Sequence, residues 1–236
     1  MVEEVKKTEG ANITQQEAYD IATEYQFASE IISLGPWTSY SLLHDPKHMS
    51  FVLGRYKFAA KMLEGKGDVI EIGCGDGFGI PLVAQGVNSV VGIDIDDRLI
   101  EGNAARLRSI KNINFQKLNI CEQAPDKKFD AAYSIDVIEH LDPNLDEPFM
   151  ENTLKCLKDD CVYVIGTPNV TAEQYASEQS AIQHINLKSH KGLKELMQKY
   201  FENVFMFCMN DEVLHTGYGP MGHYLFAVCA GKKKRG

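Results

Sequence analysis

The segment Asp68–Ile80, which reads DVIEIGCGDGFGI, carries the clearest chemical signal in the sequence. Four glycines at every second position follow its apolar beginning: Gly73, Gly75, Gly77 and Gly79. Alternating glycines let a backbone turn tightly and approach a ligand with no Cβ in the way. The dinucleotide-binding spacing G-x-G-x-x-G needs a glycine at position 78 or 80, where this chain has Phe78 and Ile80. The loop therefore favours a nucleotide-like ligand other than a dinucleotide.

Acidic residues around this loop indicate the charge of that ligand. Glu71 precedes the loop and Asp76 lies within it, so a pyrophosphate would meet carboxylates. A ligand that carries an ammonium or sulfonium group suits this acidity better. Asp94 ends the next apolar run, about 20 residues past the loop, where an acid accepts hydrogen bonds from ribose hydroxyls in nucleotide-binding α/β folds. Ile95 follows it and is placed to lie against an adenine ring.

Three histidines are candidates for moving a proton near neutral pH. His184 is the first choice for a general base, and His140 is a second candidate whose alternative role is a structural hydrogen bond. His190 is a third, although it more readily caps or flanks a helix that starts near it. No histidine group has a metal-binding spacing such as H-x-x-x-H with a third ligand, so the sequence predicts no metal.

The elements that must position these residues follow from short apolar runs after residue 68. Five such runs read as strands buried on both faces of a parallel sheet: 68–72, 89–94, 113–119, 129–134 and 161–166. Helical patterns at 97–107 and 148–157 alternate with them and imply right-handed crossovers. Two last runs, 202–209 and 223–230, read as an antiparallel pair. The sequence predicts a doubly wound α/β domain with a seven-stranded sheet.

The residues before the sheet are predicted to form a helical extension, residues 1–66, ahead of a core at 67–236. Apolar residues recur at helical spacing from Thr14 to Ser33 and again from Phe51 to Leu63. The proline-containing segment 34–48 between them reads as an ordered loop. Trp37 in that loop either packs the extension onto the core or forms part of a lid.

Composition limits the partners. The chain has 24 Lys and Arg against 33 Asp and Glu, a net charge of −9, which weighs against nucleic acid as the main substrate. The basic run 232–235 reads as a frayed tail. No apolar stretch approaches the ~20 residues of a membrane span, and the charged start of the chain lacks a secretory signal. Six cysteines without a C-x-x-C pair read as buried free thiols, so we expect a cytosolic protein.

Three motifs together resemble the class I S-adenosylmethionine-dependent methyltransferases, which have a Rossmann-like fold. They are E-x-G-x-G-x-G at 71–77, GIDID at 92–96 and FDAAYSIDVIEHL at 129–141. The resemblance implies S-adenosylmethionine as cofactor and S-adenosylhomocysteine as product. It implies that Gly77 contacts the cofactor and that the following residues face its methionine portion: Glu71, Gly73, Cys74 and Gly75.

The resemblance assigns further cofactor contacts. Asp94 and Ile95 would hold the ribose and adenine. Asn119 stands where the family often has an acid that bonds the adenine amino group, and Ile120 follows it; an amide oxygen can still accept that bond. The methionine end would be enclosed after the fourth strand by Ser134, Ile135 and Asp136. Arg55 either pairs with the methionine carboxylate or is a surface arginine.

The sequence identifies the methyl acceptor less closely than it identifies the cofactor. The acidic charge and short insertions favour a small molecule methylated on oxygen or nitrogen, with acceptor-side segments near 170–195 and 210–222. The segment 35–48 faintly resembles methyltransferases of bacterial surface-polysaccharide decoration, which suggests a sugar- or phosphate-linked acceptor. The alternatives are a protein methyltransferase and a non-catalytic S-adenosylmethionine-binding module; the glycine spacing disfavours a nicotinamide-dependent oxidoreductase. The oligomeric state is not predicted.

Overall fold

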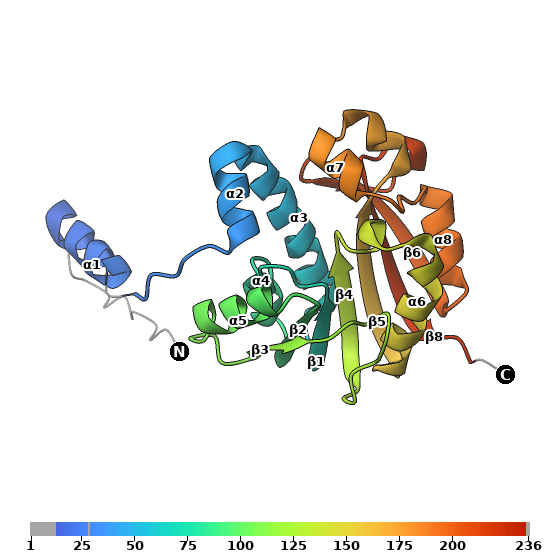
Figure 1. The fold of residues 1–236 in the computed structure, drawn as a ribbon. Helices are drawn as coiled ribbons and strands as arrows, with labels where there is room; N and C mark the ends of the chain where they lie inside the picture. Colours follow the sequence, from blue (N-terminus) through green and yellow to red (C-terminus); the bar gives the residue numbers. More distant parts are fainter. Residues whose placement is uncertain (1–12, 28, 235–236) are drawn as a thin grey trace. The chain divides into compact units, whose positions relative to one another are not determined.

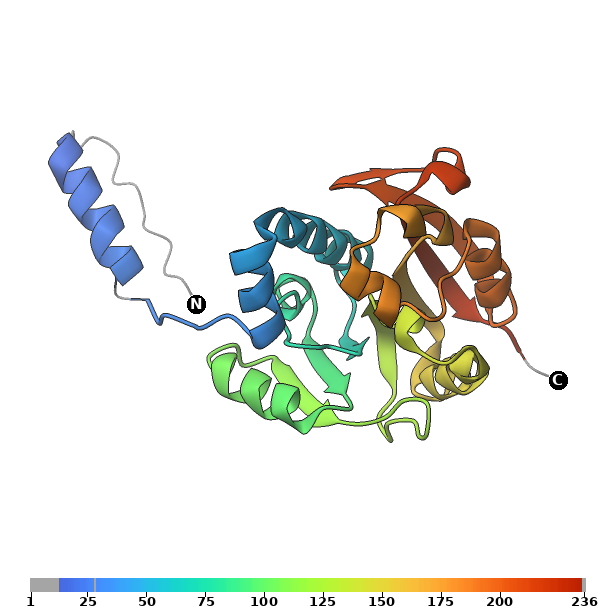
Figure 2. The same cartoon turned by 45° about the horizontal axis from the view of Figure 1, so that its top comes forward.

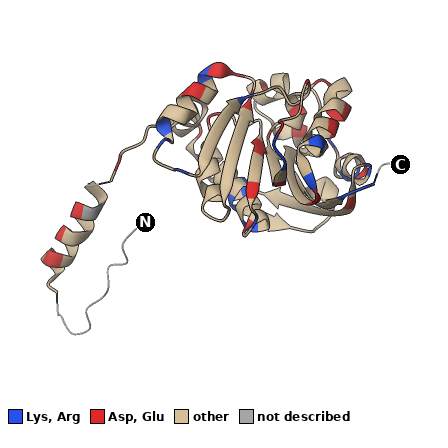
Figure 3. Cartoon of the chain, turned by 90° about the horizontal axis from the view of Figure 1, so that it is seen from below, with Lys and Arg blue, Asp and Glu red and all other residues tan. Residues whose placement is uncertain are grey.

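The computed structural model describes residues 13–27 and 29–234, and the chain divides into two compact units, residues 1–33 and 34–236. In the first unit, helix α1 spans Gln15–Phe27 and carries acidic but no basic side chains (Figure 3). The prediction of a helix up to Ser33 was therefore too long. Ile31 and Ile32 are β-branched and Ile31 is 94% exposed, so neither propensity nor packing extends the helix. Ala28 and residues 1–12, on which part of the expectation rested, lie outside the described residues.

The second unit begins with two helices where the sequence analysis expected a loop. Helix α2 spans Pro36–His44 and helix α3 spans Pro46–Leu63, so α3 also starts earlier than predicted. Each proline occupies the first turn of its helix, where the missing N–H costs no hydrogen bond and the fixed φ suits a helix. The two prolines therefore mark helix starts, and the expectation of a loop at 34–48 was wrong.

One eight-stranded sheet forms the centre of this unit (Figure 1). In the order β3-β2-β1-β4-β5-β8-β6-β7, its strands are Ile113–Lys117, Ser89–Asp94, Asp68–Ile72, Phe129–Ile135, Leu157–Pro168, Tyr224–Lys232, Phe201–Asn210 and Val213–His215. The first five are parallel, and β8 pairs antiparallel with both β5 and β6. The doubly wound sheet is thus confirmed, with one addition: the three-residue strand β7 pairs with β6 at the edge.

Helices cover both faces of the sheet and divide the core into two layers. Helix α3 and helix α4 (Ile80–Ala84) bury Tyr56, Phe58 and Val83 against one face. Helix α6 (Asp146–Lys155) and helix α8 (His190–Gln198) bury Phe149 and Leu193 against the other. Helix α5 (Asp97–Arg106) packs beside β2 and β3, and the carboxylate of Asp96 caps its first turn by accepting from Arg98 N.

Short helical segments gather near the carboxyl ends of the parallel strands. They are η1 (Ile138–His140), η2 (Pro143–Leu145), η3 (Val170–Tyr175), α7 (Glu178–Gln183) and η4 (Gly219–Met221). Figure 2 shows α2 and α3 on one side of this end of the sheet and α7 on the other. Among the helices that the structure describes, none combines the length and apolar character that a bilayer crossing requires.

Candidate active site

The glycine loop connects β1 to α4 in a backbone conformation that requires glycine. The φ angles of Gly73, Gly75 and Gly77 are +72°, +52° and +67°, in the left-handed region that other residues rarely adopt. Gly73 N and Cys74 N both donate to Ile93 O at 2.9 Å, which fixes the loop against the end of β2. The loop therefore presents a rigid, side-chain-free backbone at the carboxyl end of the first strand.

Asp94 lies beside this loop at the end of β2. One carboxylate oxygen accepts from Gly75 N at 2.9 Å and the other from Asp96 N at 3.1 Å. Each oxygen keeps a second lone pair, so Asp94 can still accept hydrogen bonds from a ribose. Ile95 is 65% exposed directly after it, an apolar side chain available to an adenine face. These placements fit the expected nucleoside contacts.

The two acids that suggested a cationic ligand are engaged with the helices of the N-terminal side. Glu71 is fully buried and accepts hydrogen bonds from Tyr56 Oη at 2.6 Å and Tyr133 Oη at 3.0 Å. Burial raises the pKa of Glu71 to about 8, although these two bonds oppose the shift. Asp76 accepts from Thr38 N at 2.8 Å and Thr38 Oγ1 at 3.1 Å. Glu71 and Asp76 thus anchor α3 and α2 to the core.

The bond to Asp76 brings Trp37 over the glycine loop. A Cβ added to Gly75 would lie 2.5 Å from Trp37 Cζ3, so the indole rests directly on the loop backbone. The ring is nevertheless 59% exposed. Trp37 is therefore held at the loop but is not buried in the core. This placement is what we expect of a residue that covers a ligand.

The residues after β3 and within the end of β4 have local roles. Asn119 donates from Nδ2 to Glu122 Oε1 at 2.8 Å and accepts at Oδ1 from Cys121 N, while Ile120 is buried in the core. Ser134 shares a 2.7 Å hydrogen bond with Tyr163, and Ile135 packs on the opposite face. Of these four expected cofactor contacts, Asn119 alone is not buried.

Asp136 projects from the end of β4 in a left-handed backbone conformation, with φ of 57°. Its Oδ2 pairs with Arg55 Nη1 at 2.7 Å, and the Arg55 guanidinium lies 4.0 Å from the centre of the Tyr224 ring. Arg55 is thus no surface arginine: its side chain is only 11% exposed and pairs with Asp136. Two atoms of the pair, Arg55 Nε and Asp136 Oδ1, are buried without a hydrogen-bond partner.

Glu139 was not among the predicted site residues, yet it lies beside two of them, His140 and His184. It lies in η1, is fully buried, and accepts from Thr167 Oγ1 at 3.0 Å through Oε2 while Oε1 has no partner. Burial, with a further contribution from Asp136, raises the pKa of Glu139 to about 8. The sequence feature that could have identified Glu139 as a site residue is its position directly before His140.

Two of the predicted histidines meet at this glutamate. The ring centroids of His140 and His184 are 5.0 Å apart. One ring nitrogen of each histidine and one carboxylate oxygen of Glu139 all lie within 4.8 Å of one another. Burial, and then the neighbouring His140, lower the pKa of His184. His190 does not join them: it opens α8 and packs against Gly219.

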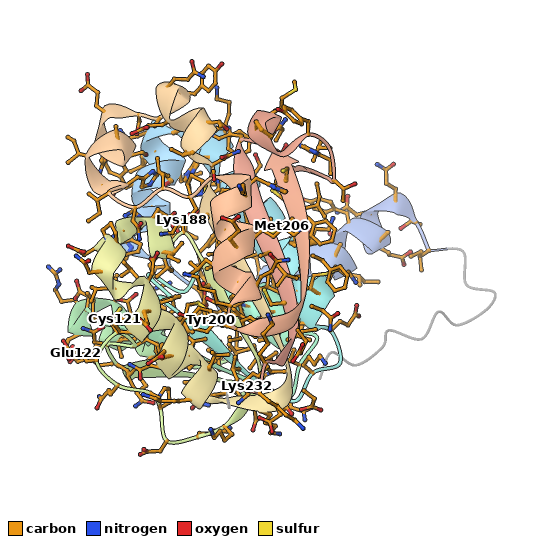
Figure 4. All side chains as sticks on the ribbon, turned by 90° about the vertical axis from the view of Figure 1, so that its right-hand side faces the viewer. Cys121, Glu122, Lys188, Tyr200, Met206 and Lys232 are labelled. Carbon is orange, nitrogen blue, oxygen red and sulfur yellow. The ribbon has the colours of Figure 1, made fainter. Side chains whose placement is uncertain are left out.

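The segment after α7, which follows His184, is hydrogen-bonded to η1 and to the first residue of α6. Asn186 N donates to Glu139 O at 3.0 Å, and Asn186 Nδ2 donates to Asp146 Oδ1 at 2.8 Å. Lys188, labelled in Figure 4, forms an ion pair with the same carboxylate. The two segments that were expected to face the acceptor meet near η3 and η4, where Asn169 Nδ2 donates to the carbonyls of Gly219 and Gly222 at 3.0 and 2.8 Å.

Comparison with known proteins gives a family match. The profile described as a methyltransferase domain matches residues 47–204. The ubiquinone biosynthesis O-methyltransferase of Rickettsia akari is 32% identical over 142 residues, covering 58% of this chain and 55% of that protein. A probable S-adenosylmethionine-dependent methyltransferase of Mycolicibacterium smegmatis is 31% identical over 103 residues, covering 43% and 38%. This chain therefore matches about half the length, or less, of these relatives.

Solved structures share the fold. The methyltransferase domain of bacterial CtHen1-C superposes with a TM-score of 0.65 at 18% identity, covering 78% of this chain and all of that one. The DhpI–SAH complex superposes with a TM-score of 0.62 at 15% identity, covering 83% and 91%. At these identities the likeness establishes the arrangement of strands and helices and nothing finer.

Proposed function

Because this chain belongs to the family of S-adenosylmethionine-dependent methyltransferase domains, we propose that it methylates an oxygen or nitrogen atom of a small molecule. The observation that carries this proposal is the juxtaposition of two groups at one end of the sheet. The glycine loop and Asp94 follow β1 and β2, and Glu139, His140 and His184 gather after the neighbouring strand β4. A nucleoside site beside a proton-handling group is what methyl transfer to a protonated acceptor requires.

S-adenosylmethionine supplies a methyl carbon bonded to a positively charged sulfur. Transfer breaks the carbon–sulfur bond, forms a carbon–oxygen or carbon–nitrogen bond, and releases the acceptor's proton. The glycine backbone and Asp94 would hold the nucleoside, and Trp37 would cover it and exclude water. The acceptor atom would be activated at the group formed by Glu139, His140 and His184.

The acceptor itself is proposed to be small, with a sugar- or phosphate-linked molecule as the more specific form. The net charge of −9 and the short segments η3, α7 and η4 support a small acceptor over a nucleic acid. A protein acceptor would need an extended groove for a peptide, and a non-catalytic binding module would need no activating group. The unpaired oxygen of buried Glu139 favours an enzyme over that module, because a buried carboxylate oxygen is costly without a partner.

Release of S-adenosylhomocysteine in the presence of candidate acceptors tests the proposal. Quinols, hydroxylated aromatic acids, sugar phosphates and a short peptide form the panel. We expect turnover with one of the small molecules, and His184→Ala should reduce kcat at least about tenfold while S-adenosylmethionine affinity changes little. Turnover of the peptide alone, or full activity of His184→Ala, would contradict the proposed acceptor class or the proposed activating group, respectively.

A further inference from the structure

Glu139, His140 and His184 form a set of ligands suited to a metal ion. Their three candidate ligand atoms lie within 4.8 Å of one another although His184 is 44 residues from His140 in the chain. Ligand atoms around a first-row metal sit about 2.0–2.2 Å from the ion, so small side-chain rotations would close the set around one cation. Two imidazoles and one carboxylate form a set that binds Zn²⁺, Mn²⁺, Fe²⁺ or Co²⁺ in preference to Mg²⁺ or Ca²⁺.

A second observation, independent of that clustering, indicates a missing partner. Glu139 is fully buried, and its Oε1 has no hydrogen-bond donor among the described residues. The nearby Asp136 Oδ1 is also unpaired, because Arg55 binds only the other oxygen of that carboxylate. Buried carboxylate oxygens are normally satisfied by donors or by cations. A divalent ion would give Glu139 Oε1 the partner that it lacks.

Neighbouring groups hold the ligands in place as they do around metal ions. His140 Nδ1 lies 3.2 Å from Gln183 O, and donation from Nδ1 to that carbonyl leaves Nε2 with its lone pair. Glu139 Oε2 accepts from Thr167 Oγ1, which orients the carboxylate. The Asn186 bond to Glu139 O fixes the segment that carries His184. Groups outside the set thus orient His140 and Glu139, and the segment that carries His184 is tied to the backbone of Glu139.

We propose that Glu139, His140 and His184 bind one divalent transition-metal ion that takes up the acceptor oxygen. This inference deepens the proposed function, on which its acceptor role rests, and differs from the sequence-based expectation of no metal. A histidine bound to a metal cannot also accept a proton, so activation of the acceptor passes from a histidine base to the cation. A hydroxyl bound to the cation would have a lowered pKa and would lose its proton to water. Its oxygen would then attack the methyl carbon as the carbon–sulfur bond breaks, and S-adenosylhomocysteine would leave. The acceptor class narrows to hydroxyl-bearing molecules.

Cobalt binding tests the site without any assay of activity. The full-length protein, stripped of metal by chelation and dialysis, is titrated with Co²⁺ while its visible d–d absorption is recorded. We expect one equivalent to bind to the wild type. Glu139→Gln and His184→Ala should each weaken binding at least about tenfold. His44→Ala removes an exposed histidine outside the set and should leave binding unchanged.

The variants are checked by circular dichroism and by binding of S-adenosylhomocysteine, which reports the cofactor side separately. The inference is overturned if the wild type binds no stoichiometric Co²⁺, or if the two ligand variants bind it as tightly as the wild type. Equal weakening by His44→Ala would also overturn it. If S-adenosylhomocysteine binds but cobalt does not, the metal site is excluded and the methyltransferase proposal stands. If cobalt binds but S-adenosylhomocysteine does not, the metal site stands and the methyltransferase proposal is contradicted.

Discussion

The glycine loop with Asp94, the proposed cofactor side, and the residues after β4 around Glu139, the proposed acceptor side, differ in how completely the chain satisfies its own polar groups. On the cofactor side, the loop amides bond to Ile93 O and Asp94, and the two acids bond to tyrosines and Thr38. After β4, three atoms are buried without partners: Glu139 Oε1, on the proposed acceptor side, and Arg55 Nε and Asp136 Oδ1, from residues expected at the methionine end of the cofactor. A site for a ligand that is always the same can have all its polar groups hydrogen-bonded before the ligand binds. Buried polar groups without partners, in contrast, indicate where a bound ligand supplies the missing hydrogen bonds.

The cofactor side should be the more sensitive to backbone changes, and Gly73→Ala tests this with the largest expected effect. The substitution places a Cβ 2.6 Å from Val137 at a φ of +72°. Left-handed strain costs about 1–2 kcal/mol, and overpacking adds about 1–3 kcal/mol. We therefore expect the free energy of unfolding to fall by roughly 2–5 kcal/mol, measured by denaturant titration.

Gly65→Ala is the matched control, because Gly65 has a φ of +79° with nothing within 4 Å of its added Cβ. It should lose only the strain, about 1–2 kcal/mol. Equal losses for the two variants would show that the glycine loop is not tightly packed and would weaken the contrast between the two sides.

The buried Glu71 sharpens the comparison through pH. Its folded-state pKa of about 8 lies above the ordinary value of 4.5, so between these values the folded chain keeps a proton that the unfolded chain has lost. The stabilisation linked to this proton is complete below pH 4.5 and is lost as pH rises toward 8. Relative to Glu71→Gln, the wild type should lose about 1 kcal/mol of stability per pH unit across this window. Parallel stability curves for the two proteins would contradict the assignment.

The smallest expected effect concerns Trp37, the only tryptophan in the chain. Because the ring is only partly covered where it rests on Gly75, Trp37→Ala should lower stability by at most about 2 kcal/mol and weaken cofactor binding by less than about tenfold. S-adenosylhomocysteine should change the fluorescence of the wild type in a saturable manner. Unchanged fluorescence at saturation, shown by calorimetry, would exclude Trp37 as a cover over the ligand.

The sequence predicted the core well because its signals there are local. The run Asp68–Ile72, the alternate glycines and Asp94 lie within 27 residues of one another, and the family match confirms the class that they indicated. The helix starts at Pro36 and Pro46 were missed because proline was taken as a loop residue rather than as a first-turn residue. Strand β7 has three residues, too few for an apolar pattern to declare it.

The acceptor side could be predicted only in part, since folding assembles it from distant residues. His140 and His184 were both named, but nothing in their spacing showed that they meet, or that Glu139 lies beside them. The partners of Arg55 and Asp76 could not be predicted either, because Asp136 is 81 residues from Arg55 and Thr38 is 38 residues from Asp76 along the chain. Tertiary pairing of charged groups leaves no periodic signal for a sequence to show.

Calorimetric titration with S-adenosylmethionine, and separately with NADH, tests the central claim most directly. The account predicts that the wild type binds one equivalent of S-adenosylmethionine and no NADH. It also predicts that Asp94→Ala weakens this binding by about 1–3 kcal/mol, the cost of a lost hydrogen-bond acceptor for the ligand. A folded wild-type protein that binds NADH instead, or binds S-adenosylmethionine as tightly after loss of Asp94, would contradict the assignment of this end of the sheet.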